Sequence, residues 1–239
     1  MVTLSRLLAR HWIADETIGL QFARPSGFEF EPGQTVDVTL VDPAETDAEG
    51  NTRTFSIASA PHEDHLLFAT RVRKSAFKRM LAAAPIGSEV QIDGPTGSFT
   101  LHRDVSKPAV LLAGGIGITP FRSMVLDVTE RRTSRPVWLF DSNLRPETSA
   151  FLGELAEAAD SNPAFRFVPT MTEMGDSQRS WSGETGLIDQ AMLSRHLSGA
   201  QGSIYYVAGP PKMVASMRQM LLESGIEKSA VRAEDFSGY

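Results

Sequence analysis

The chain has 239 residues, 41% of them hydrophobic, which is enough for one large domain or for two domains with a core each. Its net charge of -6 disfavours a nucleic-acid or anionic-membrane partner. Cysteine is absent, which excludes disulfides, thiolate zinc sites and iron–sulfur clusters held by this chain, and the histidines lack metal-ligand spacing. No apolar run approaches the ~20 residues of a membrane span, and residues 1–16 lack a signal-peptide core. We expect a soluble, cytoplasmic protein without a metal site.

The N-terminal part of the chain has the pattern of antiparallel strands. Apolar and polar residues alternate in short blocks over 2–40, and further β-rich segments follow at 53–59, 66–73 and 90–99. Residues 75–84 have the spacing of a short helix. Six or more short strands within about a hundred residues predict a small barrel. The acidic stretch 42–50 predicts a solvated turn without a function.

After Pro108 the pattern changes to alternating strands and helices. Strands are predicted at 109–113, 137–140, 165–168 and 204–207, and helices at 119–132, 147–159, 187–196 and 211–224. This order is typical of a parallel sheet with helices on both faces. We therefore expect two domains, an antiparallel β-barrel over 1–106 and a parallel-sheet α/β domain over 107–239.

The segment 109–124, AVLLAGGIGITPFRSM, predicts a buried strand, a glycine turn and a helix. Its three glycines permit positive φ and leave no Cβ in the way of a ligand, Thr119 is the predicted N-cap, and Pro120 suits the first helical turn. Free N–H groups and the helix dipole at such a turn form an anion site that suits a nucleotide pyrophosphate. A purely structural alternative is that the glycines only let strand and helix pack closely.

Two further segments follow predicted strands and so lie at the same edge of the sheet. They are DSNLR at 141–145 and AGPPKM at 208–213. Ligands of parallel sheets bind at the carboxyl ends of the strands. Two glycine-containing turns at that edge favour a dinucleotide over a packing role.

Four motifs in order resemble the flavin-binding ferredoxin–NADP reductase superfamily over nearly the whole chain. They are RTFSIAS at 53–59, GPTGSF at 94–99, GGIGITP at 114–120 and AGPPKM at 208–213. The resemblance implies a flavin-binding barrel followed by a nucleotide-binding α/β domain, with FAD and NADH or NADPH as cofactors. It also implies a reductase that passes hydride to bound FAD and electrons on to ferredoxin, flavodoxin or another redox protein.

The resemblance also implies roles for individual residues. Arg53 holds the flavin pyrophosphate, Phe55 lies against the isoalloxazine ring, and Ser56 lies near flavin N5 and acts in catalysis. The other residues assigned to FAD are Thr54, Thr70, Arg71, Val72, Lys74, Ser75, Ala76 and Phe77. The residues assigned to the nicotinamide dinucleotide are Gly115, Gly117, Thr119, Pro120, Ser142, Asn143, Arg145, Gly209, Pro210 and Met213. At the C-terminus, Tyr239 or Phe236 brings an aromatic ring over the flavin, and Tyr239 is the second residue assigned to catalysis.

Three departures from the family pattern concern the cofactors. The family's cysteine before Gly-Pro is Ala208, and the segment 74–77 replaces the usual G-x-x-S turn for the flavin phosphates. The plant-type branch that uses NADPH has a Ser-Arg pair where residues 170–173 read Thr-Met-Thr-Glu. The single carboxylate and the lack of an arginine there favour NADH slightly, because a carboxylate repels the 2′-phosphate of NADPH. Ser142, Asn143 and Arg145 are nevertheless able to bind a phosphate.

Two other functions stay open at this point. Some compact members of the superfamily are NAD(P)H:flavin reductases that use flavin as a diffusible substrate, although Arg71 and the segment 74–77 favour bound flavin. The chain can also be a flavin- and nucleotide-binding electron-transfer or regulatory subunit of a larger complex. In that case any iron–sulfur centre belongs to a partner.

Overall fold

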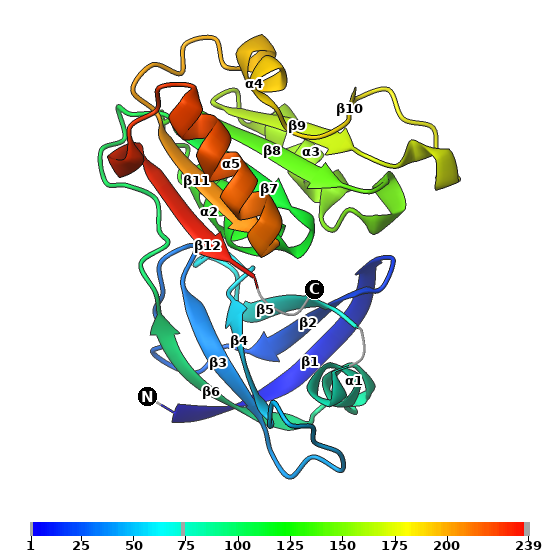
Figure 1. Cartoon of the computed structure of the whole chain (residues 1–239). Helices are drawn as coiled ribbons and strands as arrows, with labels where there is room; N and C mark the ends of the chain where they lie inside the picture. Colours follow the sequence, from blue (N-terminus) through cyan, green and yellow to red (C-terminus); the bar gives the residue numbers. More distant parts are fainter. Residues whose placement is uncertain (1, 73–74, 237–239) are drawn as a thin grey trace.

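The structure is a computed structural model of the chain and describes residues 2–72 and 75–236. Within these ranges the strands form two sheets of six, one above the other in Figure 1. No helix in the described part of the chain is long and apolar enough to traverse a bilayer. The same residues include no group of three or more acidic or histidine side chains arranged to hold a metal ion.

The first sheet is antiparallel throughout, in the order β4-β3-β6-β1-β2-β5. Its strands are β1 (Val2–Ala14), β2 (Thr17–Ala23), β3 (Thr35–Leu40), β4 (Thr52–Ser56), β5 (His65–Arg71) and β6 (Glu89–Thr96). The two edge strands of the sheet, β4 and β5, approach each other, as in a barrel. The Ala58 N–H, just after β4, donates to Leu67 O on β5 at 2.8 Å. Helix α1 (Ala76–Ala83) places Phe77 and Leu81 in the core of this sheet. The predicted antiparallel architecture and short helix are confirmed.

The second sheet is parallel, in the order β10-β9-β8-β7-β11-β12. Its longer strands are β7 (Ala109–Gly114), β8 (Val137–Asn143), β9 (Phe165–Met171) and β11 (Ile204–Gly209). On one face lie α2 (Ile118–Glu130) and α3 (Leu152–Ser161), and on the other lie α4 (Gln190–His196) and α5 (Pro211–Glu223). Every residue of the central strand β7 is buried, which explains its unbroken apolar sequence. The predicted α/β architecture is confirmed.

The strand order reverses direction at β7, which has β8 on one side and β11 on the other. At such a switch point the loops leaving adjacent strands diverge and open a crevice at the carboxyl ends. The 3₁₀ turn η1 (Gly115–Gly117) leaves β7 there, and α5 leaves β11. This edge of the sheet faces the barrel (Figure 1).

The edges of the parallel sheet differ from the sequence prediction. Two short strands, β10 (Glu184–Thr185) and β12 (Val231–Asp235), extend it. β12 pairs with β11 from Tyr205↔Val231 to Gly209↔Asp235, so the residues that precede Phe236 form a strand that the sequence analysis did not predict. α3 begins later than predicted, because Pro146–Thr148 forms the separate turn η2 and Phe151 has a φ of 63°.

Candidate functional site

A cavity lies between the barrel and the carboxyl edge of the parallel sheet. Its volume, including the open mouth, is about 570 Å³. Strands β4 and β5 form one wall, and α1, η1, the first turn of α2 and the residue after β12 contribute the rest. The lining residues are Arg53, Thr54, Phe55, Ser56, Ala69, Thr70, Arg71, Lys78, Ile116, Thr119 and Phe236. Most of them are residues that the sequence assigns to a site, drawn from four segments of the chain.

Three lining residues are not among the cofactor residues assigned from the sequence. Ala69 is an apolar position of the β-rich segment 66–73 and Ile116 is one of the glycine turn, so nothing distinguishes them from core residues. Lys78 of α1 was identifiable from its charge, because it belongs to a basic cluster with Arg79.

Arg53 and the first turn of α1 hold a carboxylate. The Arg53 Nη2 lies 2.8 Å from Glu49 Oε2 and 3.3 Å from Asp47 Oδ1. The Ala76 N–H donates to Asp47 Oδ2 at 2.8 Å and is the main cause that keeps the pKa of Asp47 below its ordinary value. The Oγ of Ser75, the N-cap of α1, is buried with no hydrogen-bond partner among the described residues. A guanidinium, a helix N-terminal N–H and a free hydroxyl are the donors that phosphate binding requires.

The acidic loop 42–50 is therefore more than a solvated turn, contrary to the sequence prediction. Arg53 Nη1 donates to backbone carbonyls within residues 49–52 at 2.7–3.1 Å. Glu45 of the same loop pairs with Arg79 of α1. The charges of the loop and of the helix are complementary, and this was the signal available in the sequence.

Phe55 and Ser56 lie in the cavity wall but expose little surface. The Phe55 ring centroid lies 5.8 Å from that of Phe68 and 6.0 Å from that of Phe77, and only 7% of the residue is exposed. Much of this ring therefore packs in the barrel core, which differs from an aromatic ring that lies free against a ligand. Phe236 contributes a second aromatic ring to the cavity, and its N–H donates to Gly209 O at 3.0 Å.

The glycine turn after β7 is shaped mainly by close packing. Only Gly115 has a positive φ, 53°, whereas Gly114 is extended at -132° and Gly117 is helical at -61°. A Cβ on Gly117 would overlap the Ala208 carbonyl, and one on Gly114 would overlap the Met213 sulfur. The expectation of positive φ is thus wrong for two of the three glycines, which instead let the turns after β7 and β11 touch.

The predicted N-cap role of Thr119 is also wrong. η1 continues directly into α2, so the N-cap is Gly117 and Thr119 lies inside the first turn. Thr119 is 2% exposed and its Oγ1 donates to Ile116 O at 3.0 Å. Pro120 lies in the first helical turn, as predicted, and is buried.

Comparison with known proteins agrees with this geometry. The family model of the oxidoreductase NAD-binding domain matches residues 111–219. The phenol hydroxylase P5 protein of Acinetobacter pittii is 30% identical over 224 residues, which are 92% of this chain and 60% of that protein. Ferredoxin–NADP reductase B of Sorangium cellulosum is 29% identical over 243 residues, 97% of this chain and 96% of that protein. Over nearly its whole length the chain is similar to reductases of the ferredoxin–NADP reductase superfamily.

A solved structure from the superfamily has the same fold. The ferredoxin NADP+ reductase from Neisseria gonorrhoeae, crystallised with FAD and NADP, superposes with a TM-score of 0.80 and 24% identity over 98% of both chains. The chain spans 60% of the length of the phenol hydroxylase P5 protein.

Several residues assigned from the superfamily motifs lie elsewhere. Asn143 is buried and donates to Asp141 Oδ2 at 2.9 Å and to Ser149 Oγ at 3.1 Å, and Arg145 Nη2 lies 3.9 Å from Asp15 Oδ2. Lys74 and Tyr239 lie outside the described residues. The described residues assigned to the site that do not line the cavity are Val72, Ser75, Ala76, Phe77, Gly115, Gly117, Pro120, Ser142, Asn143, Arg145, Gly209, Pro210 and Met213.

Two carboxyl groups at the carboxyl edge of the sheet have raised pKa values. Burial raises the pKa of Asp141, at the end of β8, to about 7 despite hydrogen bonds from Ser149 and Asn143. Burial likewise raises the pKa of Glu234, on β12, to about 7. Asp141 Oδ1 and Glu234 Oε2 are buried and have no hydrogen-bond partner in the described part of the chain. The superfamily motifs contain no signal for either group, because the shifts arise from tertiary burial.

We predict that Asp141→Asn stabilises the protein at alkaline pH. Asp141 is 0% exposed, and its pKa in the native state is about 7, above the ordinary aspartate value of 3.8. Between these two pH values the native state therefore binds more protons than the unfolded chain. Stability of the wild type therefore falls as pH rises through that window, and the asparagine variant escapes this loss. The melting temperature of the variant minus that of the wild type should increase by a few degrees from about pH 5 to about pH 8. The exposed Asp160→Asn on α3 serves as the control, and a pH-independent difference for Asp141→Asn would contradict the assignment.

Proposed function

We propose that the chain is an NAD(P)H-dependent flavoprotein reductase. It binds FAD on the barrel and a nicotinamide dinucleotide on the α/β domain, with a preference for NADH, and it passes electrons to a separate redox protein such as ferredoxin. The observation that carries the proposal is the single cavity lined by the RTFS segment of β4, by Thr70 and Arg71 of β5, and by Ile116 and Thr119. Hydride transfer requires the donor and the acceptor to meet in one place. This cavity is lined both by residues assigned to FAD and by Thr119, which is assigned to the dinucleotide.

The donors around Arg53 fit the phosphates of FAD. They already hold the carboxylates of Asp47 and Glu49, and the buried Ser75 hydroxyl is free to donate. Arg53, Ser75 and the Ala76 N–H would hold the flavin phosphates. The barrel, residues 1–106, is then the FAD domain, and 107–239 is the nucleotide domain.

When bound, FAD supplies a two-electron acceptor that can release its electrons singly. The residues of the chain bind and orient the reactants and exclude water. Ser56 positions the reacting edge of the flavin, Phe236 covers the cavity from the C-terminal side, and the N–H groups of η1 and α2 bind the dinucleotide phosphates. Glu173, exposed after β9, supports the preference for NADH because its charge repels a 2′-phosphate.

Visible spectroscopy of the purified full chain tests this function. A flavin spectrum should persist after FAD is added and excess FAD is removed, and anaerobic NADH should bleach it faster than NADPH does. A chain that neither binds FAD nor accelerates its reduction by either nucleotide would contradict the proposal.

The Asp47 contact favours a second candidate, an NAD(P)H:flavin reductase that uses flavin as a diffusible substrate. A carboxylate of the chain that competes with the flavin phosphate weakens flavin binding. Loss of flavin during gel filtration, together with turnover that depends on added free flavin, would favour this candidate over the first.

We predict that Ser56→Ala slows flavin reduction by NADH by about 10-fold or more, because one polar contact at the reacting edge is lost. Dinucleotide affinity should change little. Anaerobic stopped-flow at saturating NADH measures the rate, and the exposed Ser134→Ala is the control. An unchanged reduction rate in Ser56→Ala would exclude a catalytic role for this hydroxyl.

We predict that Asp47→Asn raises the affinity for FAD by about threefold while it lowers the stability of the chain without FAD. The asparagine removes one of the two carboxylates beside Arg53, leaving Glu49, and weakens the acceptor for the Ala76 N–H. Fluorescence titration with FAD and thermal melts measure the two effects. Asp42→Asn, an exposed residue of the same loop, is the matched control. Weaker FAD binding by Asp47→Asn would mean that the carboxylate orients Arg53 for phosphate instead of competing with it.

A further inference from the structure

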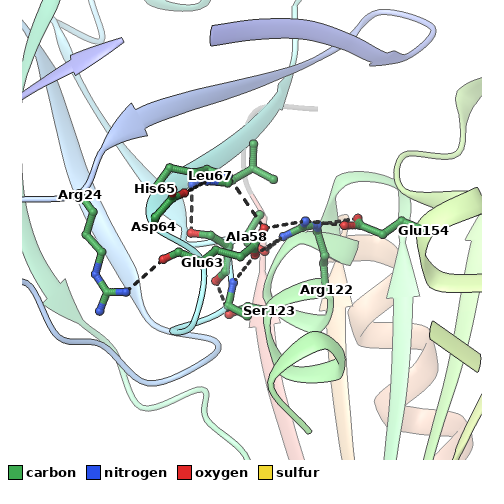
Figure 2. A network of polar contacts seen from close by, with 11 residues as sticks. Arg24, Ala58, Glu63, Asp64, His65, Leu67, Arg122, Ser123 and Glu154 are labelled. Atoms are coloured by element: carbon green, nitrogen blue, oxygen red, sulfur yellow. Dashed lines mark hydrogen bonds and ion pairs between the residues drawn. The ribbon is translucent and has the colours of Figure 1, made fainter. Parts of the chain in front are cut away.

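A buried arginine connects the two halves of the molecule. Figure 2 shows the Arg122 guanidinium of α2 between the carboxylates of Glu63 and Glu154. Its Nη1 and Nη2 donate to the two Glu63 oxygens at 2.9 and 3.2 Å, and its Nε and Nη2 donate to the two Glu154 oxygens at 2.7 and 2.5 Å. Arg122 is only 5% exposed. Both carboxylates are therefore held in bidentate geometry, which fixes direction as well as distance.

A further hydrogen bond of the guanidinium reaches the segment that follows the RTFS motif. Arg122 Nη1 donates to Ala58 O at 2.7 Å, and the neighbouring Ser123 Oγ donates to Ser59 O at 2.6 Å. In sequence, Ala58 comes two residues after Ser56, and Arg122 comes three residues after Thr119. Two adjacent residues of α2, just after the cavity-lining Thr119, thus bind the segment just after the cavity-lining Ser56.

The barrel side of this connection is itself held in place. The Ala60 N–H donates to Glu63 Oε2 at 2.6 Å, and Arg24 Nη1 donates to Pro61 O at 2.6 Å. Arg24 Nη1 also donates to Glu63 O at 3.2 Å, and Figure 2 shows a continuous network from Arg24 through Glu63 and Arg122 to Glu154. Burial disfavours the charge on Arg122, but the two carboxylates outweigh it and raise its pKa, while Arg122 lowers the pKa of Glu63. Arg122 and Glu63 are therefore charged together.

Apolar contacts also join the two halves, but they constrain orientation less. The Phe99 and Phe121 ring centroids, for example, lie 5.8 Å apart across this junction. Apolar attraction is non-directional, so such rings tolerate sliding. A planar guanidinium that binds two carboxylates and a carbonyl does not tolerate such sliding, because its hydrogen bonds are directional. This matters for catalysis, because a displacement of about 1 Å between reactants can lower a rate by about 10².

We propose that Arg122 is a positioning residue for hydride transfer: by binding Ala58 O and Glu63 on the barrel side, and Glu154 on its own side, it sets how closely the nicotinamide approaches the flavin. The inference rests on the proposed reductase function. Arg122 acts through the segments that it holds and does not line the cavity.

The test uses the full chain loaded with FAD and the variants Arg122→Lys, Glu63→Gln and the double variant. Three quantities are measured for each: FAD affinity by fluorescence, NAD⁺ affinity by difference absorption, and the first-order rate of flavin reduction by saturating NADH under anaerobic conditions. The strength of the long-wavelength charge-transfer band, which reports stacking of nicotinamide on flavin, is recorded in the same experiment. Arg131→Lys is the matched control, because Arg131 lies at the C-terminal end of the same helix, 63% exposed, in an ion pair with Asp127.

For Arg122→Lys we expect reduction to slow by about 10-fold or more with a weaker charge-transfer band, while both affinities stay within about threefold of wild type. Glu63→Gln should slow reduction less. The double variant should be no slower than Arg122→Lys, because the two residues act through one contact. Arg131→Lys should match the wild type in every quantity.

Two results would overturn the inference about Arg122 and leave the proposed function standing. One is a wild-type reduction rate and charge-transfer band in Arg122→Lys. The other is a slower rate that is explained entirely by lost FAD or NAD⁺ affinity. If Arg122→Lys does not fold, Glu154→Gln replaces it, since this carboxylate is 38% exposed, and an unchanged rate in that variant would also overturn the inference. If the wild type shows no flavin reduction by either nucleotide, the proposed function fails and the inference fails with it.

Discussion

The burial of one guanidinium between two sheets is the constraint on which the cavity depends. A charge removed from water requires charged or polar partners, and the partners of Arg122 lie on both sides of the junction: Glu63 and Ala58 on the barrel side, Glu154 on α3. The apolar surfaces that meet at Phe99 and Phe121 favour association, but they accept many orientations. The ionic network selects one of them, and the cavity walls on β4 and at η1 are parts of the segments that it holds.

Carboxylates in this chain fall into two physical classes. Asp47 and Glu63 lie beside a guanidinium or a helix N-terminal N–H, and their pKa values are lowered. Asp141 and Glu234 are buried at the carboxyl edge of the parallel sheet without a hydrogen-bonded cation in the described residues, and their pKa values are raised to about 7. Carboxylates of the first class form ion pairs or charge-assisted hydrogen bonds, whereas burial favours the neutral, protonated form of the second class. Such perturbed groups are concentrated at functional sites more often than elsewhere in proteins.

The glycine turn combines two requirements in one short segment. Gly115 needs its left-handed φ to reverse the chain, while Gly114 and Gly117 need to lack a Cβ because the turn after β11 touches them. Close packing, one of the two interpretations open at the start, thus applies to Gly114 and Gly117, while Gly115 has a conformational role. The contact of the two turns brings the ends of β7 and β11 together at the switch point of the sheet, where an α/β fold binds its ligand.

The sequence alone determined the elements and their class. Alternating side chains predicted the antiparallel strands, the apolar run at 109–113 predicted a fully buried parallel strand, and the ordered motifs brought Arg53, Ser56, Thr70 and Thr119 into one predicted site, because these signals are local in the chain. Tertiary structure decided the rest. The pairing of β12 with β11, the contact of Asp47 with the Ala76 N–H, and the raised pKa of Asp141 depend on contacts between distant residues, and so does the Arg122 network, whose partners lie 32 to 64 residues away. Burial and charge pairing across such separations leave no periodic pattern along the chain, so only the folded molecule shows them.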